Sequence, residues 1–157
     1  MSLDTPHKPG DRRFLGQVPA QAVSVLAREL CTRHKLIVLI APDNQSANQL
    51  MQDCPAWCKN HEVLLFPDWE TLPYDYFSPH QDIISERLRF LARLPTLTQA
   101  VIIIPAPSLM QRIAPTGYIQ TQVFNVKLGD RWDIATQRRV FEQAGYYCVE
   151  VHPIQFP

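Results

Sequence analysis

Three short aliphatic runs constrain the fold of this chain more than any other feature of its sequence. They are LIVLIA at 36–41, EVLLF at 62–66 and AVIIIP at 100–105. Such solid runs of leucine and β-branched residues are typical of strands buried on both faces of a sheet. Segments with helical spacing separate them, so we expect an α/β fold in which a parallel sheet is flanked by helices through right-handed crossovers.

The helical segments are predicted from apolar residues that recur every three to four positions. Pro19 suits the first turn of the first helix, Asp43 or Ser46 can cap the second, and Asp82 can cap the third. The expected helices cover 18–34, a segment after Asp43, 82–94 and 107–114.

The pattern changes near Pro115-Thr116-Gly117. Beyond it we expect a strand at 122–128, a helix that starts after Asp133 and stops at Gly145, and a strand at 146–151. One β-α-β unit cannot bury its own faces. The predicted organisation is therefore a flexible N-terminus over 1–13, an α/β domain over 14–116, and over 117–157 the start of a second α/β domain, truncated at Pro157. The unpaired edges predict disorder or contact with another chain over 146–157.

The charge balance bears on the class of partner. The 157 residues include 15 lysines and arginines against 15 acids, so no net charge favours nucleic acid or an anionic membrane. No apolar stretch approaches the roughly 20 residues of a membrane span, and the N-terminus lacks the apolar core of a signal peptide. We expect a cytoplasmic protein without a membrane partner.

Two cysteines have a spacing that invites a test for zinc. Cys54 and Cys58 form a CxxxC pair with His61 nearby. A structural zinc site needs four ligands, and a second close pair is missing. We interpret the cysteines as reduced thiols that pack as small apolar groups, and we expect no metal.

A glycine before the first helix calls for comparison with a phosphate-binding loop, GxxxxGK[ST]. In the frame that starts at Gly16, Gln21 takes the place of the second glycine, Ala22 replaces the lysine and Val23 replaces the hydroxyl residue. The third aliphatic run also ends without an acidic pair that could hold magnesium. The sequence therefore predicts no nucleotide cofactor and no hydrolysis.

The stretch FPDWETLPYDYFSPH at 66–80 crowds aromatic residues, prolines and acids without any periodicity. Asp68, Glu70 and Asp75 could be paired catalytic carboxylates, but among prolines we interpret them as caps and turn residues. Neither Ser78 nor Ser108 lies in a nucleophile elbow, so we expect no catalytic residue.

This stretch resembles a signature of bacterial transcription-repair coupling factors, in their N-terminal module, which is similar in turn to the excision repair protein UvrB. Segments 36–53 and 101–115 resemble core blocks of both families, and 14–23 falls where UvrB has its intact phosphate loop. The signature residues are Trp69, Tyr74, Asp75, Tyr76, Phe77 and Pro79.

The resemblance implies a UvrB-like scaffold with a degenerate RecA-type phosphate loop, similar to domain 1a of UvrB. Only four residues, SPHQ, separate Phe77 from the next helix, which leaves no room for the DNA-clamping hairpin of UvrB. The aromatic residues Trp69, Tyr74, Tyr76 and Phe77 are then expected to pack a connector against the sheet rather than to stack on bases.

The resemblance also implies partners. The parent proteins are ATP-dependent DNA translocases that couple stalled RNA polymerase to nucleotide excision repair by recruiting UvrA. This chain would be a non-catalytic scaffold piece of such a protein. Its UvrA contact is expected beyond Pro157, and contacts with RNA polymerase and DNA are expected in domains that this sequence lacks.

Two alternatives remain open at this point. One is a DNA-binding module that uses the aromatic run 69–77 with Arg87, Arg89 and Arg93; the other is an enzyme with an unrecognised site. A second basic cluster, of Arg131, Arg138 and Arg139, supplies candidate partner contacts.

Overall fold

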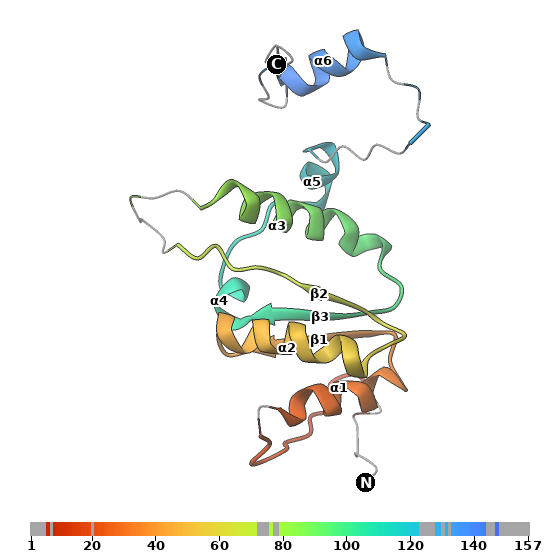
Figure 1. Ribbon diagram of the computed structural model, residues 1–157, viewed down its shortest axis with the longest axis vertical. Coiled ribbons are helices and arrows are strands. Elements are labelled where there is room, and N and C mark those ends of the chain that lie inside the picture. The colour runs from red at the N-terminus through yellow and green to blue at the C-terminus, as the bar shows by residue number, and fades with distance from the viewer. Residues whose placement is uncertain are drawn as a thin grey trace, which may run out of the picture.

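The core of the computed structural model is a parallel sheet of three strands, which confirms the predicted α/β class (Figure 1). The strands are β1 (Leu36–Ala41), β2 (Glu62–Leu65) and β3 (Ala100–Pro105), in the order β1-β3-β2. The structure describes residues 6, 8–19, 21–71, 76, 79–122, 128–129, 131, 133–143 and 147. Each strand falls on one of the aliphatic runs.

The central strand carries most of the burial. Val101 and Ile103 of β3 have no exposed surface, because the strand has a neighbour on each side and helices on both faces. Leu36 of β1 and Glu62 of β2 both lie opposite Ala100, so the three strands start in register.

Helices form one layer on each side of the sheet (Figure 1). The pair α1 (Ala22–Cys31) and α2 (Asn44–Trp57) covers one face, and α3 (Gln81–Arg93) covers the other. The remaining helical elements are η1 (Leu94–Thr96), α4 (Ala106–Leu109), α5 (Thr116–Gln122) and α6 (Ile134–Gln143).

The helix starts agree only in part with the predicted caps. Asp43 caps α2, because its side chain accepts from the backbone N–H of Ser46 at 2.7 Å. The α3 cap is His80 rather than Asp82, since the His80 ring accepts from the Asp82 backbone N–H at 3.3 Å. Asp82 lies in the first turn, where the positive end of the helix dipole favours a carboxylate. Pro19 precedes α1 instead of lying inside it.

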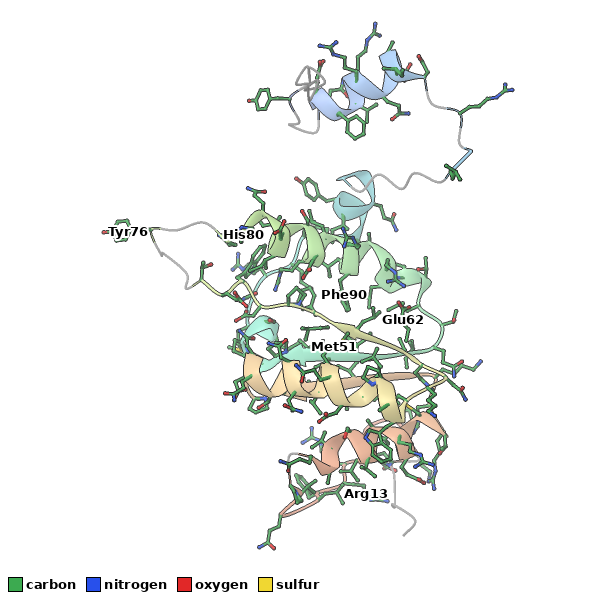
Figure 2. All side chains as sticks on the ribbon, viewed as in Figure 1. Arg13, Met51, Glu62, Tyr76, His80 and Phe90 are labelled. Atoms are coloured by element: carbon green, nitrogen blue, oxygen red, sulfur yellow. The ribbon has the colours of Figure 1, made fainter. Side chains whose placement is uncertain are left out.

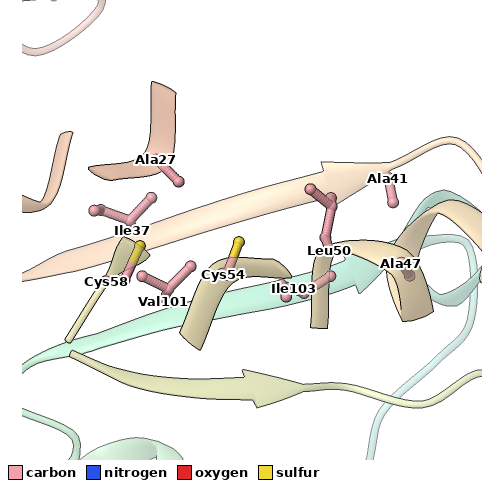
Figure 3. Close-up of a cluster of buried hydrophobic side chains, with 9 residues drawn as sticks. All are labelled: Ala27, Ile37, Ala41, Ala47, Leu50, Cys54, Cys58, Val101 and Ile103. Carbon is pink, nitrogen blue, oxygen red and sulfur yellow. The ribbon is translucent and has the colours of Figure 1, made fainter. Parts of the chain in front are cut away.

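Two core clusters hold the layers together. The first joins α1 and α2 to the sheet and consists of Ala27, Ile37, Ala41, Ala47, Leu50, Cys54, Cys58, Val101 and Ile103 (Figure 3). The second joins α3 to the sheet through Phe66, Phe90, Ala100 and Ile102. The burial of Cys54 and Cys58 among aliphatic side chains confirms that they pack as small apolar groups.

The expectation that β1 is buried on both faces is wrong. Leu36, Val38 and Ile40 are 51%, 54% and 60% exposed. Val38 pairs with Ile102 and therefore points to the α3 side, where α3 covers β3 but not the edge strand. We call these three side chains the open β1 face.

The segment after the sheet differs from its prediction. Helix α4 is shorter than the helix expected over 107–114, and the unexpected α5 packs on α3 with Ile119 buried. Gln122, the expected first residue of a strand, ends α5, and Leu128 lies in a turn, so those strand bounds are wrong. The helix after Asp133 is confirmed as α6.

Other predictions for the ends of the chain are not tested. The expected strand at 146–151 lies outside the described residues except for Tyr147, and the division at 116 and 117 stays a prediction. In the described part of the chain, no helix is long and apolar enough to cross a membrane.

Candidate functional site

Polar side chains converge at the carboxyl edge of the sheet, where α/β folds ordinarily build their sites. Asp68 follows β2 and accepts from Ser108 Oγ at 3.2 Å and from Gln111 Nε2 at 2.7 Å, both beyond β3. Asn44, beyond β1, donates from Nδ2 to the other Asp68 oxygen at 3.5 Å. One carboxylate thus ties together the segments that leave all three strands.

Arg87 lies beside this carboxylate and is almost completely buried, with 2% of its surface exposed. Its guanidinium carbon lies 4.2 Å from the ring centre of Phe66 and 4.3 Å from that of Trp69, so the cation is held between two aromatic faces. Its Nη1 donates to the carbonyl oxygen of Pro67. Burial lowers the pKa of Arg87, and the charge of Asp68 opposes that shift.

We call Phe66, Asp68, Trp69 and Arg87 the connector clamp. Through Arg87 it holds the segment after β2 against α3. Through Asp68 it holds the same segment against the residues that follow β3. The Asp68 carboxylate accepts three side-chain donors, and no second acid–base group is bonded to it among the described residues. The arrangement therefore orders the segment that directly follows β2.

One interpretation of the sequence is corrected here, because Asp68 is not a cap or turn residue. The signal that was missed is topological: Asn44, Asp68 and Ser108 each follow the end of a predicted parallel strand, so they had to meet at one edge. Glu70, exposed with φ of 58°, has the left-handed backbone of a turn residue.

The aromatic signature divides into a packed part and an exposed part. Trp69 packs against Arg87 as expected of a connector, and Pro79 is half-buried. Tyr76 does not pack: it is fully exposed and points away from the body of the protein, where no element lies within reach (Figure 2). Tyr74, Asp75 and Phe77 lie outside the described residues, as does Ser78.

The degenerate loop leads into an apolar cavity. Val18 and Val23 line it together with Ile40, Pro42 and Leu50, and its volume is about 430 Å³. No lysine or arginine lines it within the described part of the chain. Gly16 has open space where a Cβ would lie, and Gln21 and Ala22 simply begin α1.

The three arginines of α3 do not form one surface. Arg87 is buried in the clamp, and Arg93 binds both oxygens of Glu62 at 2.7 and 2.8 Å. Arg89 is exposed and lines a shallow hollow beside Glu86. The combined cationic face required for a DNA-binding module is therefore not present on this helix.

The second basic cluster lies on and before α6. Arg131 and Arg139 are exposed, whereas Arg138 forms an ion pair with Glu142 at 2.9 Å. Their role as partner contacts stays a prediction. For zinc, the described residues contain no group of three or more suitable ligands, and the His61 ring contacts the His34 carbonyl oxygen instead.

Comparison with known proteins identifies relatives of the whole chain. No family model matches it. It is 41% identical over 148 residues to the transcription-repair-coupling factor of Haemophilus influenzae, which covers 94% of this chain. It is also 41% identical over 146 residues, 92% of the chain, to the protein of the same name from Escherichia coli. A third, from Rickettsia typhi, is 29% identical over 103 residues.

The match covers most of this chain but only a small part of each relative. The chain spans 13% of the Haemophilus and Escherichia proteins, in their N-terminal region. Nearly the whole chain is nevertheless aligned, at an identity that reflects common descent. Over this region the chain therefore belongs to the family of bacterial transcription-repair-coupling factors.

Proposed function

We propose that this chain is a non-enzymatic scaffold of a cytoplasmic transcription-repair coupling factor. The observation that carries the proposal is the apolar cavity at the degenerate loop, in a chain aligned over nearly its full length with members of that family. No lysine or arginine lines this cavity within the described residues, so a phosphate would lack the cationic ligand of an intact loop. What the described residues offer is an α/β body in which the segment directly after β2 is held by the connector clamp.

The test of this proposal is magnesium-dependent nucleotide chemistry. We expect magnesium not to increase the affinity for ATP, and we expect no release of phosphate from ATP by this chain. Phosphate release above the no-protein control, removed by substituting Val23 or Gln21, would contradict the scaffold assignment.

The proposed partner of the complete protein is UvrA, with RNA polymerase and DNA bound by parts that this sequence does not contain. We place the UvrA contact beyond Pro157. Calorimetry with UvrA should therefore detect no binding to the 157-residue chain and clear binding to a chain extended through the second domain. Binding to the short chain would move the contact onto it, with Arg131, Arg138 and Arg139 the first candidates.

The alternative of a DNA-binding module receives no support from the α3 arginines, because Arg87 and Arg93 are already engaged. We expect no binding to single- or double-stranded DNA at low salt. Binding that weakens steeply as salt rises would restore that alternative.

A further inference from the structure

A second cavity lies at the opposite, amino edge of the sheet, where α1 and α2 end. Its volume is about 440 Å³. Arg28, Trp57, Lys59, Asn60, His61 and Gln99 contribute to its walls. Among the described residues, no aspartate or glutamate lines it, so the cavity is basic in a chain whose net charge is zero.

The cations of this cavity are not used to complete the helix ends. In the last turn of each helix a carbonyl group accepts from a backbone N–H group, that of Glu29 from Thr32 at 3.2 Å and that of Cys54 from Cys58 at 2.8 Å. Neither Arg28 nor Lys59 forms an ion pair within the part of the chain that the structure describes. Their charges are therefore available to a ligand.

The other walls add an aromatic surface and neutral hydrogen-bonding groups. The Trp57 side chain is 42% exposed, with the Arg28 guanidinium 5.8 Å from its ring centre. His61 is 7% exposed; its Nε2 donates to the His34 carbonyl oxygen at 2.9 Å, and its Nδ1 is buried without a partner in the described structure. Burial raises the pKa of the Cys31 thiol to about 12, so this wall adds no negative charge at neutral pH.

We propose that this cavity binds a nucleoside monophosphate. Arg28 and Lys59 supply the charge-assisted hydrogen bonds that a phosphate group prefers, and the Trp57 ring supplies a stacking surface for a base. Asn60 and Gln99 can hydrogen-bond to the base or the sugar. Magnesium is not required, because the site has cations of its own and no acid to hold a metal.

The test is an NMR titration of the 157-residue chain with AMP in the absence of magnesium. We expect saturable shifts in the Trp57 indole N–H signal and in the backbone signals of 28–32 and 57–61. Arg28→Ala and Lys59→Ala should each weaken binding about tenfold, the effect of losing one charged hydrogen bond. Arg112→Ala, which removes an exposed arginine beyond the carboxyl edge, is the matched control and should bind AMP like the parent chain.

Three results would overturn the proposal. They are the absence of saturable shifts at millimolar AMP, equal weakening by Arg112→Ala, and binding of inorganic phosphate as tight as that of AMP. A 5′-phosphorylated tetranucleotide, compared with its unphosphorylated form, distinguishes the source of the nucleotide. Preference for the phosphorylated strand over AMP assigns the site to a nucleic-acid end, and the reverse assigns it to free nucleotide.

Discussion

At the scale of single residues, the burial of Arg87 is the most consequential feature. A guanidinium taken out of water is tolerated only when its charge is compensated. Here the compensation comes from two aromatic faces, a backbone carbonyl and the nearby Asp68 carboxylate. The structural role of the signature residue Trp69 is thus to cover the buried Arg87 guanidinium on α3.

We predict that Arg87 and Asp68 stabilise the fold as a unit. Arg87→Met should lower the free energy of unfolding by about 3 kcal/mol, because it leaves the Pro67 carbonyl and Asp68 without their cation. The double variant with Asp68→Asn should lose less than the sum of the single variants. Urea denaturation of all four proteins measures the coupling.

The matched control for this cycle is Arg89→Met on the exposed side of the same helix. It should change the free energy of unfolding by no more than about 0.5 kcal/mol. Strict additivity of Arg87→Met and Asp68→Asn would show that the two side chains do not act together, whatever their separate effects.

At the scale of elements, the aliphatic runs predicted the three strands of the sheet, and helical periodicity predicted the main helices. They failed where tertiary contacts decide the structure. Helix α5 contains Gly117 and is short, and it exists because Ile119 packs on α3. The contacts of the clamp were likewise not evident along the sequence. Arg87 bonds to Pro67 across 20 residues and Gln111 bonds to Asp68 across 43, so these groups meet only in the folded chain.

The N-cap of α2 gives a prediction with a defined pH dependence. Hydrogen bonds from Ser46 lower the pKa of Asp43 in the folded protein. A depressed pKa in the folded state means that the stabilisation is present above the unfolded value, about 3.9, and is lost as the pH falls through the folded value. Asp43→Ala should therefore lower the melting temperature at pH 7.

The same variant should differ less from the parent chain as the pH is lowered below 4, because protonation removes the charged cap from the parent as well. Thermal denaturation followed by circular dichroism measures both temperatures. Gln52→Ala, at an exposed and non-titratable position of the same helix, should lack this pH-dependent difference. A constant difference for Asp43→Ala from pH 7 to pH 3 would contradict the argument.

At the scale of the whole molecule, the sheet is covered more fully on the α1 and α2 side than on the α3 side. The open β1 face exposes three aliphatic side chains in a row on an edge strand. Such a surface favours association with other apolar surfaces, and the zero net charge offers little repulsion against it. We therefore expect the open β1 face to promote self-association of the isolated chain at high concentration.

We predict that polar substitution is tolerated on this face and not on the opposite one. Ile40→Thr should change the free energy of unfolding by less than about 1 kcal/mol and should reduce self-association, measured by sedimentation velocity over a range of concentrations. The matched variant Ile103→Thr, at a fully buried position, should cost about 2 kcal/mol or more. Equal costs for the two variants would show that Ile40 is covered.

The buried thiols have a practical consequence for following motion in this protein. Burial raises the pKa of Cys54 to about 11, so at pH 7 roughly one molecule in ten thousand carries the reactive thiolate at that position. Cys54 and Cys58 are also both buried in the first core cluster, so we expect their alkylation to require movement of α2 away from the sheet. The rate of iodoacetamide labelling at these two positions therefore measures how often the first core cluster opens. It can be followed by mass spectrometry under native conditions, in a chain with Cys148 replaced by serine.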